Sequence, residues 1–157
     1  MDDVAEAGHF TFAQRALPVP GDLRISWRVS ILLIILSQAR SQRASIAKLH
    51  VVNDAVRSTT ALRSLDLILA GGQPASSWHM QIEPALGRAL DLMVGARLAQ
   101  WATVAGRLGV AMTEQGKVAA RSIGAATDAL NEEKAIVAAI SGRVTETVVT
   151  KIISGMS

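Results

Sequence analysis

The sequence predicts a mainly α-helical protein that carries one small β-hairpin. Apolar residues recur at helical spacing through most of the chain after residue 24. Two short apolar runs, residues 98–102 and 108–112, flank a glycine-containing turn, which is the pattern of a hairpin. The length of 157 residues, half of them hydrophobic, suits one domain with its own core.

Composition excludes several classes of protein. Only 18% of the residues are charged and the mean hydropathy is +0.31, which excludes intrinsic disorder. The absence of cysteine excludes disulfide scaffolds, thiolate zinc sites, iron–sulfur clusters and cysteine nucleophiles. The most apolar uncharged stretch, residues 29–39, is shorter than the roughly 20 residues of a transmembrane helix. The sequence begins with acidic residues, Asp2-Asp3, which do not suit a signal peptide. We therefore expect a cytoplasmic protein.

Residues 1–23 are predicted to form an extended arm or linker. They carry four acidic residues against one arginine and end in a segment with two prolines and a glycine, which disfavour regular structure. We expect Phe10 and Phe12 to attach this arm to the rest of the protein.

Three helices are expected next. The first covers Ile25 to about Gln38, where the length of the apolar run favours a helix over a buried strand. After a polar break at residues 41–44, Ser45 is a plausible N-cap for a second helix, whose apolar face holds Ile46, Leu49 and Val52. Residues 58–60 offer caps for a third helix that ends at Gly71-Gly72.

The second half is predicted to contain the hairpin between two helices. Residues 79–83 alternate as a short strand would, and Pro84 suits the first position of a helix over Ala85 to about Arg97. The strands of the hairpin are residues 98–102 and 108–112, joined by a turn at 103–107. Thr113 is expected to cap the helix that follows.

A helical tail is expected at the C-terminus, with a break at Ser141-Gly142. Its last part places Val144, Val148 and Ile152 on one apolar stripe. Such a stripe more often belongs to a core, but it is also a candidate subunit interface. The same alternatives apply to Trp78 and Trp101.

This order of elements is that of a winged helix-turn-helix with extra helices at both ends, in which the hairpin is the wing. We therefore divide the chain into an arm at 1–23, a winged-helix domain at 24–125 and a helical extension at 126–157.

Residues suited to catalysis are few. The three histidines are far apart in sequence and form no metal-binding pair, and Glu132-Glu133 are helix neighbours that point about 100° apart. Phosphate-binding glycine loops and the G-x-S-x-G motif are missing from the sequence. We expect no enzymatic activity, no cofactor and no metal.

Positive charge is concentrated in one segment. Residues 24–63 carry a net charge of +6, residues 1–23 carry −3, and the remainder is neutral. This basic segment suits contact with DNA phosphates or with an acidic protein partner. The candidate contact residues, with two more from the second half, are Arg40, Arg43, Lys48, Arg57, Arg63, Arg88 and Arg107.

The helix before the hairpin is poorly equipped to distinguish bases. It offers only Arg88, Asp91 and Arg97, and Asp91 would repel phosphate. DNA contact, if it occurs, is therefore expected to lack sequence specificity, and a winged helix that binds proteins is favoured.

Several motifs resemble one bacterial family. They are Arg88-Ala89-Leu90-Asp91-Leu92-Met93-Val94, then Leu108-Gly109-Val110-Ala111-Met112-Thr113-Glu114-Gln115-Gly116-Lys117, and in the tail Asp128-Ala129-Leu130-Asn131-Glu132-Glu133-Lys134. The sequence is similar here to the middle components of ABC-three-component (Lamassu-like) defence systems, over roughly residues 24–155. The resemblance implies a non-catalytic winged-helix adaptor that links an SMC/Rad50-like ABC ATPase to an effector subunit in antiviral or anti-plasmid defence.

Two other functions remain open at this point. One is a dimeric winged helix-turn-helix transcriptional regulator that binds DNA through the basic segment, and the other is a small-ligand sensor with a pocket between the helices. A homodimer is compatible with the adaptor as well.

Overall fold

The computed structural model describes residues 21–156, which form seven α-helices and one three-stranded sheet. The helices are α1 (Gly21–Gln38), α2 (Ile46–Arg57), α3 (Thr59–Leu69), α4 (Pro84–Gly95), α5 (Glu114–Ala125), α6 (Asn131–Ile140) and α7 (Glu146–Ser154). The strands are β1 (Arg43–Ser45), β2 (Ala99–Val104) and β3 (Arg107–Met112). This architecture confirms the predicted mainly α fold with a small hairpin.

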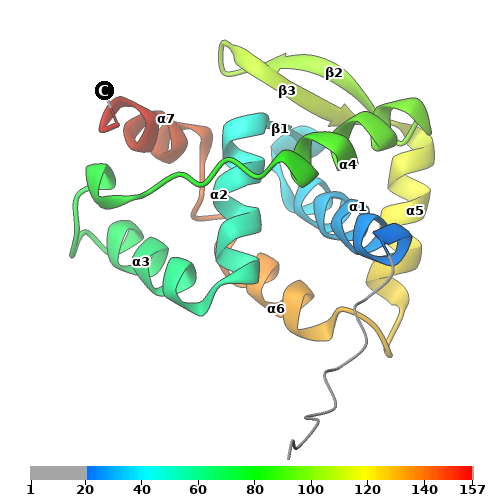
Figure 1. Cartoon of the computed structure of the whole chain (residues 1–157), viewed down its shortest axis with the longest axis horizontal. Coiled ribbons are helices and arrows are strands. Elements are labelled where there is room, and N and C mark those ends of the chain that lie inside the picture. The colour runs from blue at the N-terminus through cyan, green and yellow to red at the C-terminus, as the bar shows by residue number, and fades with distance from the viewer. Residues whose placement is uncertain (1–20, 157) are drawn as a thin grey trace, which may run out of the picture.

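Helix α1 is the centre of the fold. It packs against α2, α4, α5, α6 and β3, and Figure 1 shows it between α2 and α5 with α4 and the sheet above it. Its six consecutive residues from Ile31 to Leu36 are all at most 5% exposed. An amphipathic helix could not bury six successive residues, and this one does because neighbours surround it on every side.

Three helices begin at the caps that the sequence predicts. The hydroxyl of Ser45 accepts a hydrogen bond from the Lys48 N–H at 3.1 Å, and that of Ser58 accepts one from the Ala61 N–H at 3.2 Å. The hydroxyl of Thr113 accepts a hydrogen bond from the N–H of Gly116 at 3.1 Å. These bonds satisfy backbone donors that have no partner inside the first turn of a helix.

The sheet is antiparallel in the order β1-β3-β2. The hairpin pairs Trp101 with Val110, and β1 adds a third strand by pairing Ala44 with that same Val110. The turn between β2 and β3 consists of Ala105 and Gly106, both with positive φ (50° and 74°), as a tight hairpin with right-handed strand twist requires.

Several expected boundaries differ from the structure. Helix α1 begins at Gly21, within the stretch predicted as an arm, and α4 ends at Gly95, two residues before the expected end. β1 begins within the polar break at residues 41–44, where the sequence pattern predicts no strand. Phe10 and Phe12 lie outside the described residues.

The predicted strand at residues 79–83 is wrong. This segment pairs with no strand and is held by side chains of α2: Gln81 donates a backbone hydrogen bond to the Asp54 carboxylate, and Glu83 bonds Arg57. Its alternation of residue types is not an alternation of burial, because Gln81 and Ile82 are both exposed while Met80 packs against the core.

Within residues 21–156, no helix is both long enough and apolar enough to cross a membrane.

Candidate functional site

The structure separates the predicted contact residues into three groups. Arg40, Arg43 and Lys48 line one cavity. Arg57 and Arg107 form ion pairs with glutamates of the same chain. Arg63 on α3 and Arg88 on α4 are exposed and distant in sequence from the cavity. The basic segment is therefore not one uniform surface.

The cavity lined by Arg40, Arg43 and Lys48, which we name the basic cavity, has a volume of about 680 Å³. It lies where the end of α1, the start of α2 and the start of α7 meet. Three cationic side chains and one carboxylate, that of Glu146, line it, and hydroxyl groups complete the wall, contributed by Ser41, Ser141, Thr145 and Thr147.

Lys48 is the most buried of the three cationic residues that line the basic cavity. The residue is 5% exposed, and its ammonium group makes no hydrogen bond or ion pair with any described residue. Burial lowers the pKa of Lys48 below its usual value, and the nearby charge of Glu146 offsets this only in part.

Glu146 is occupied by other partners. Its carboxylate accepts hydrogen bonds from the Ser45 N–H at 2.9 Å and the Ser45 hydroxyl at 2.8 Å. The Arg107 guanidinium donates to the same carboxylate at 2.8 Å and to the Thr150 hydroxyl at 2.8 Å. The first turn of α7 is thereby fixed to the start of α2 and to β3.

A second glutamate joins three segments of the fold. Glu83, directly before α4, forms ion pairs with Arg28 of α1 and Arg57 of α2 and accepts a bond from Asn53 at 3.3 Å. The side chains of Glu83 and Arg28 are only 18% and 14% exposed. Arg57 is therefore a structural residue first, although the sequence offered it as a contact residue.

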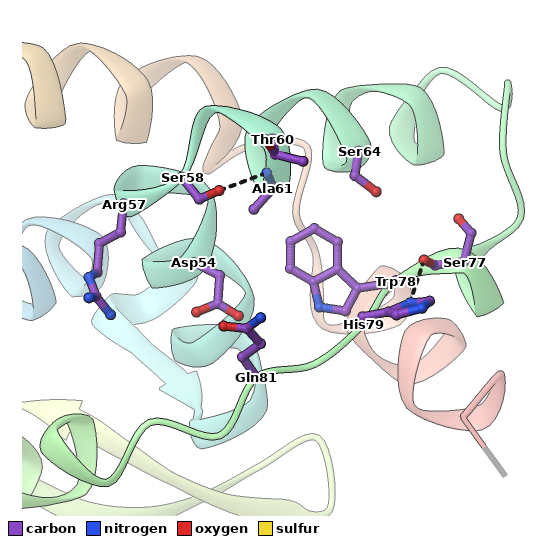
Figure 2. Close-up of a pocket in the computed structure, with 10 residues that line it drawn as sticks. All are labelled: Asp54, Arg57, Ser58, Thr60, Ala61, Ser64, Ser77, Trp78, His79 and Gln81. Carbon is purple, nitrogen blue, oxygen red and sulfur yellow. Dashed lines mark hydrogen bonds between the residues drawn. The ribbon is translucent and has the colours of Figure 1, made fainter.

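A polar pocket of about 380 Å³ lies between α2, α3 and the segment after α3. Figure 2 shows the indole of Trp78 beneath α3, with Thr60 and Ser64 above it and Asp54 and Gln81 to one side. One carboxylate oxygen of Asp54 and the indole N–H of Trp78 are buried without a hydrogen-bond partner among the described residues.

Burial also shifts the pKa values of two α2 residues near this pocket. It raises the pKa of Asp54, an effect that the Gln81 N–H and Arg57 oppose and that Glu83 reinforces. Burial lowers the pKa of His50, and the charge of Glu83 opposes this shift only in part. No group of three or more potential metal-binding side chains occurs in the part of the chain that the structure describes.

The C-terminal stripe faces the body of the protein. Val144 and Ile152 are completely buried within this chain and Val148 is half-buried. Val144 precedes α7, so the stripe continues from the loop into the helix. The stripe as a subunit interface stays a prediction, and it would require α7 to leave its present place.

Three of the exposed large apolar side chains lie on α4 and the hairpin. Leu92 of α4 is 52% exposed, and Trp101 and Leu108 of the hairpin are 44% and 61% exposed. Trp101 and Leu108 share one face of the hairpin, because Trp101 pairs with Val110 and Leu108 lies two residues from it. We name these three residues the wing surface. Trp78, in contrast, is 4% exposed, so Trp78 belongs to the core and Trp101 to the surface.

Sequence reasoning did not find Glu83 or Glu146, the two acidic residues that organise these sites. Each lies just before or in the first turn of a helix, where acidic residues are common for reasons of the helix dipole alone. The chain matches no protein-family model, no curated protein and no solved structure.

Proposed function

We propose that this chain is a winged-helix adaptor subunit that binds partner proteins and catalyses no reaction. The order α1-β1-α2-α3-α4-β2-β3, with β1 completing the sheet beside β3, supports a winged helix-turn-helix in which α3 is an insertion before the helix that precedes the wing. α4 packs against both α1 and β2, as that helix would.

The wing surface is the observation that carries the proposal. In a DNA-binding winged helix, the helix before the wing and the wing itself present cations and hydrogen-bonding side chains. Here α4 presents Leu92 beside a single cation, Arg88, and the hairpin presents Trp101 and Leu108, while Arg107 of the wing is paired with Glu146. Tryptophan and leucine exposed together suit a protein interface, in which buried aromatic side chains contribute most of the binding energy.

The proposed partners follow from the resemblance of residues 24–155 to the middle components of ABC-three-component systems. They are an SMC/Rad50-like ABC ATPase and an effector subunit encoded beside this chain. The adaptor would hold the two together, and chemistry would belong to them.

Co-purification with the neighbouring ATPase and effector tests this function. We expect the three chains to elute together, and the double change Trp101→Lys and Leu108→Lys to remove this chain from the complex. Val118→Lys on α5 is the matched control, because Val118 is also exposed, at 56%, but lies outside the wing surface. A chain that elutes alone beside those partners would contradict the proposal.

DNA binding is the second candidate function. The observation in its favour is that Arg40, Arg43, Arg63 and Arg88 make no ion pair with described residues. Arg63→Ala is the cleaner test of it, because Arg57→Ala would also break the bond to Glu83. Sequence-selective binding that weakens in Arg63→Ala and survives the wing-surface double change would favour the regulator over the adaptor.

A further inference from the structure

The basic cavity contains a largely buried lysine, Lys48, which is 5% exposed. No ion pair joins its ammonium group to an acidic residue within residues 21–156. Removing a lysine from water without a partner costs free energy, which a bound anion would recover. The one acidic side chain in the cavity wall, Glu146, is already bonded to Ser45 and Arg107. The ammonium group of Lys48 is therefore available to donate hydrogen bonds to a molecule in the cavity that Lys48 lines.

Other groups around Lys48 favour the same kind of ligand. Arg40 and Arg43 are exposed and line the same cavity, so three cations converge on it. Both α2 and α7 begin at this place, and the positive ends of two helix dipoles add to the potential. Backbone strain adjoins the cavity as well: Ser41 and Gln42 have successive positive φ values of 56° and 54°, which non-glycine residues adopt at a cost.

We propose that the basic cavity binds the terminal phosphate or diphosphate group of a small molecule. Three cations and four hydroxyl groups match the oxygen atoms of such a group, and arginine forms paired hydrogen bonds with phosphate. A volume of about 680 Å³ exceeds that of a single phosphate, so the ligand is a phosphate ester or diphosphate of moderate size. No aromatic side chain lines the cavity, so the phosphate end is the part recognised by the wall.

The depth of Lys48 separates this ligand from DNA. Phosphates of a duplex belong to a wide, stiff backbone, which contacts lysines that protrude from a surface. A terminal phosphate is narrow and can enter a cavity to reach the ammonium group of a lysine residue that is only 5% exposed. The inference does not depend on the adaptor function, because the wing surface and the basic cavity share no residue.

Calorimetric titration of the full chain with inorganic pyrophosphate tests the site. We expect binding to the wild type and a loss of affinity of about tenfold or more in Lys48→Met, since a hydrogen bond to a charged group is lost. Arg40→Gln, a change at an exposed position, should weaken binding as well. Lys117→Met is the matched control, because Lys117 is on α5 and pairs with Glu114. This variant should bind pyrophosphate as the wild type does.

Thermal unfolding without ligand checks that the variants fold. Lys48→Met should unfold at the wild-type temperature or above it, because methionine keeps the length of the side chain and removes the buried charge. If Lys48→Met does not fold, Arg40→Gln alone decides the result, since its side chain is exposed.

Three results would overturn the proposal. The first is no heat of binding to pyrophosphate at millimolar concentration, and the second is equal weakening by Lys117→Met. The third is a DNA duplex that binds with the same dependence on Lys48, which would make backbone phosphate the ligand. Titration with inorganic phosphate and with ATP then separates a single phosphate site from one that needs a larger ester.

Discussion

Asp54 shows how one residue can oppose the stability of its own helix. Its side chain is half-buried beside the polar pocket, and one of its carboxylate oxygens has no partner among the described residues. Burial raises its pKa although the Gln81 N–H and Arg57 favour the ionised form. Ionisation of the Asp54 carboxyl group is therefore less favourable in the folded state than in the unfolded chain.

The sign of the resulting pH dependence follows from linkage. A carboxyl group whose pKa is raised on folding binds its proton more tightly in the folded state. Its stabilising contribution is complete below the unfolded value, which is about 3.8. That contribution is lost as the pH rises through the folded pKa. At neutral pH the ionised Asp54 thus lowers the free energy of unfolding.

We predict that Asp54→Asn stabilises the protein at pH 7. The amide oxygen keeps the bond from Gln81 and removes the buried charge, and the melting temperature should rise by about 2–4 °C, the shift that ~1 kcal/mol produces at this chain length. The gain should shrink as the pH is lowered toward 3.8. Asp66→Asn is the control, because Asp66 is about half exposed in its pair with Arg143 and should change the melting temperature little. A lower melting temperature for Asp54→Asn at pH 7 would show that the carboxylate is stabilised in the fold.

At the scale of the element, local signals predict most of the structure. Ser45, Ser58 and Thr113 each accept a hydrogen bond from an N–H three residues ahead, so the information lies within four residues of sequence. The hairpin is equally local, because its strands are joined by two residues. These elements could be predicted because a short segment contains both partners of each bond.

The missed elements depend on distant partners. β1 is a strand only because residues 43–45 pair with residues 109–111, and neither segment alone indicates the other. Residues 79–83 have the alternation of a strand, but α2 offers them carboxylate and guanidinium groups and no strand edge lies beside them. Periodicity describes which side of a segment is buried, and it does not identify what covers that side.

Gly116 shows how closely two elements approach at the base of the hairpin. A side-chain carbon at this position of α5 would lie 2.0 Å from the carbonyl oxygen of Leu98 and 2.6 Å from Met112. Gly124, in the same helix, has no such neighbour within 4 Å. One helix therefore contains a glycine that packing requires and one that it does not.

We predict opposite effects for alanine at these two positions. Gly116→Ala should destabilise the protein by about 1–3 kcal/mol, because the helix must move away from the hairpin. Gly124→Ala should stabilise it by about 0.5–1 kcal/mol through helix propensity. Urea unfolding of both variants measures the two free energies, and a stabilising Gly116→Ala would show that α5 does not pack here as described.

At the scale of the whole molecule, the sequence identified the cations of the candidate site but not how they are divided. Arg57 and Arg107 find their glutamates 26 and 39 residues away, and Ser45 meets Glu146 across 101 residues. Charge counting along the chain cannot reveal such pairs. A sum of charges along the sequence therefore indicates a continuous basic surface that the fold does not have. It also does not show that Lys48 is buried.

The high hydrophobic content is also explained at this scale. α1 is covered on all sides, and the C-terminal helices complete the same core: Val137, Ile140, Val144, Val149 and Ile152 are all at most 2% exposed. Residues 126–156 are thus joined to the body by a continuous apolar cluster. One core extends from α1 to α7, which makes cooperative unfolding the expectation for this chain.

Ile152→Ala distinguishes a core role of the C-terminal stripe from an interface role. If Ile152 belongs to the core of a single chain, the truncation should cost about 2–5 kcal/mol, and the melting temperature should not depend on protein concentration. Ile82→Ala is the matched control, since Ile82 is 81% exposed and its truncation should change stability by less than about 0.5 kcal/mol.

If the stripe instead joins two subunits, the melting temperature of the wild type should rise with protein concentration, because mass action stabilises a fold that depends on association. Ile152→Ala should then abolish that rise. Thermal unfolding over a hundredfold range of concentration, with light scattering for the mass, separates the two. We expect the concentration-independent result, because Val144 and Ile152 already have neighbours within their own chain and a dimer built on them would have to expose that core first.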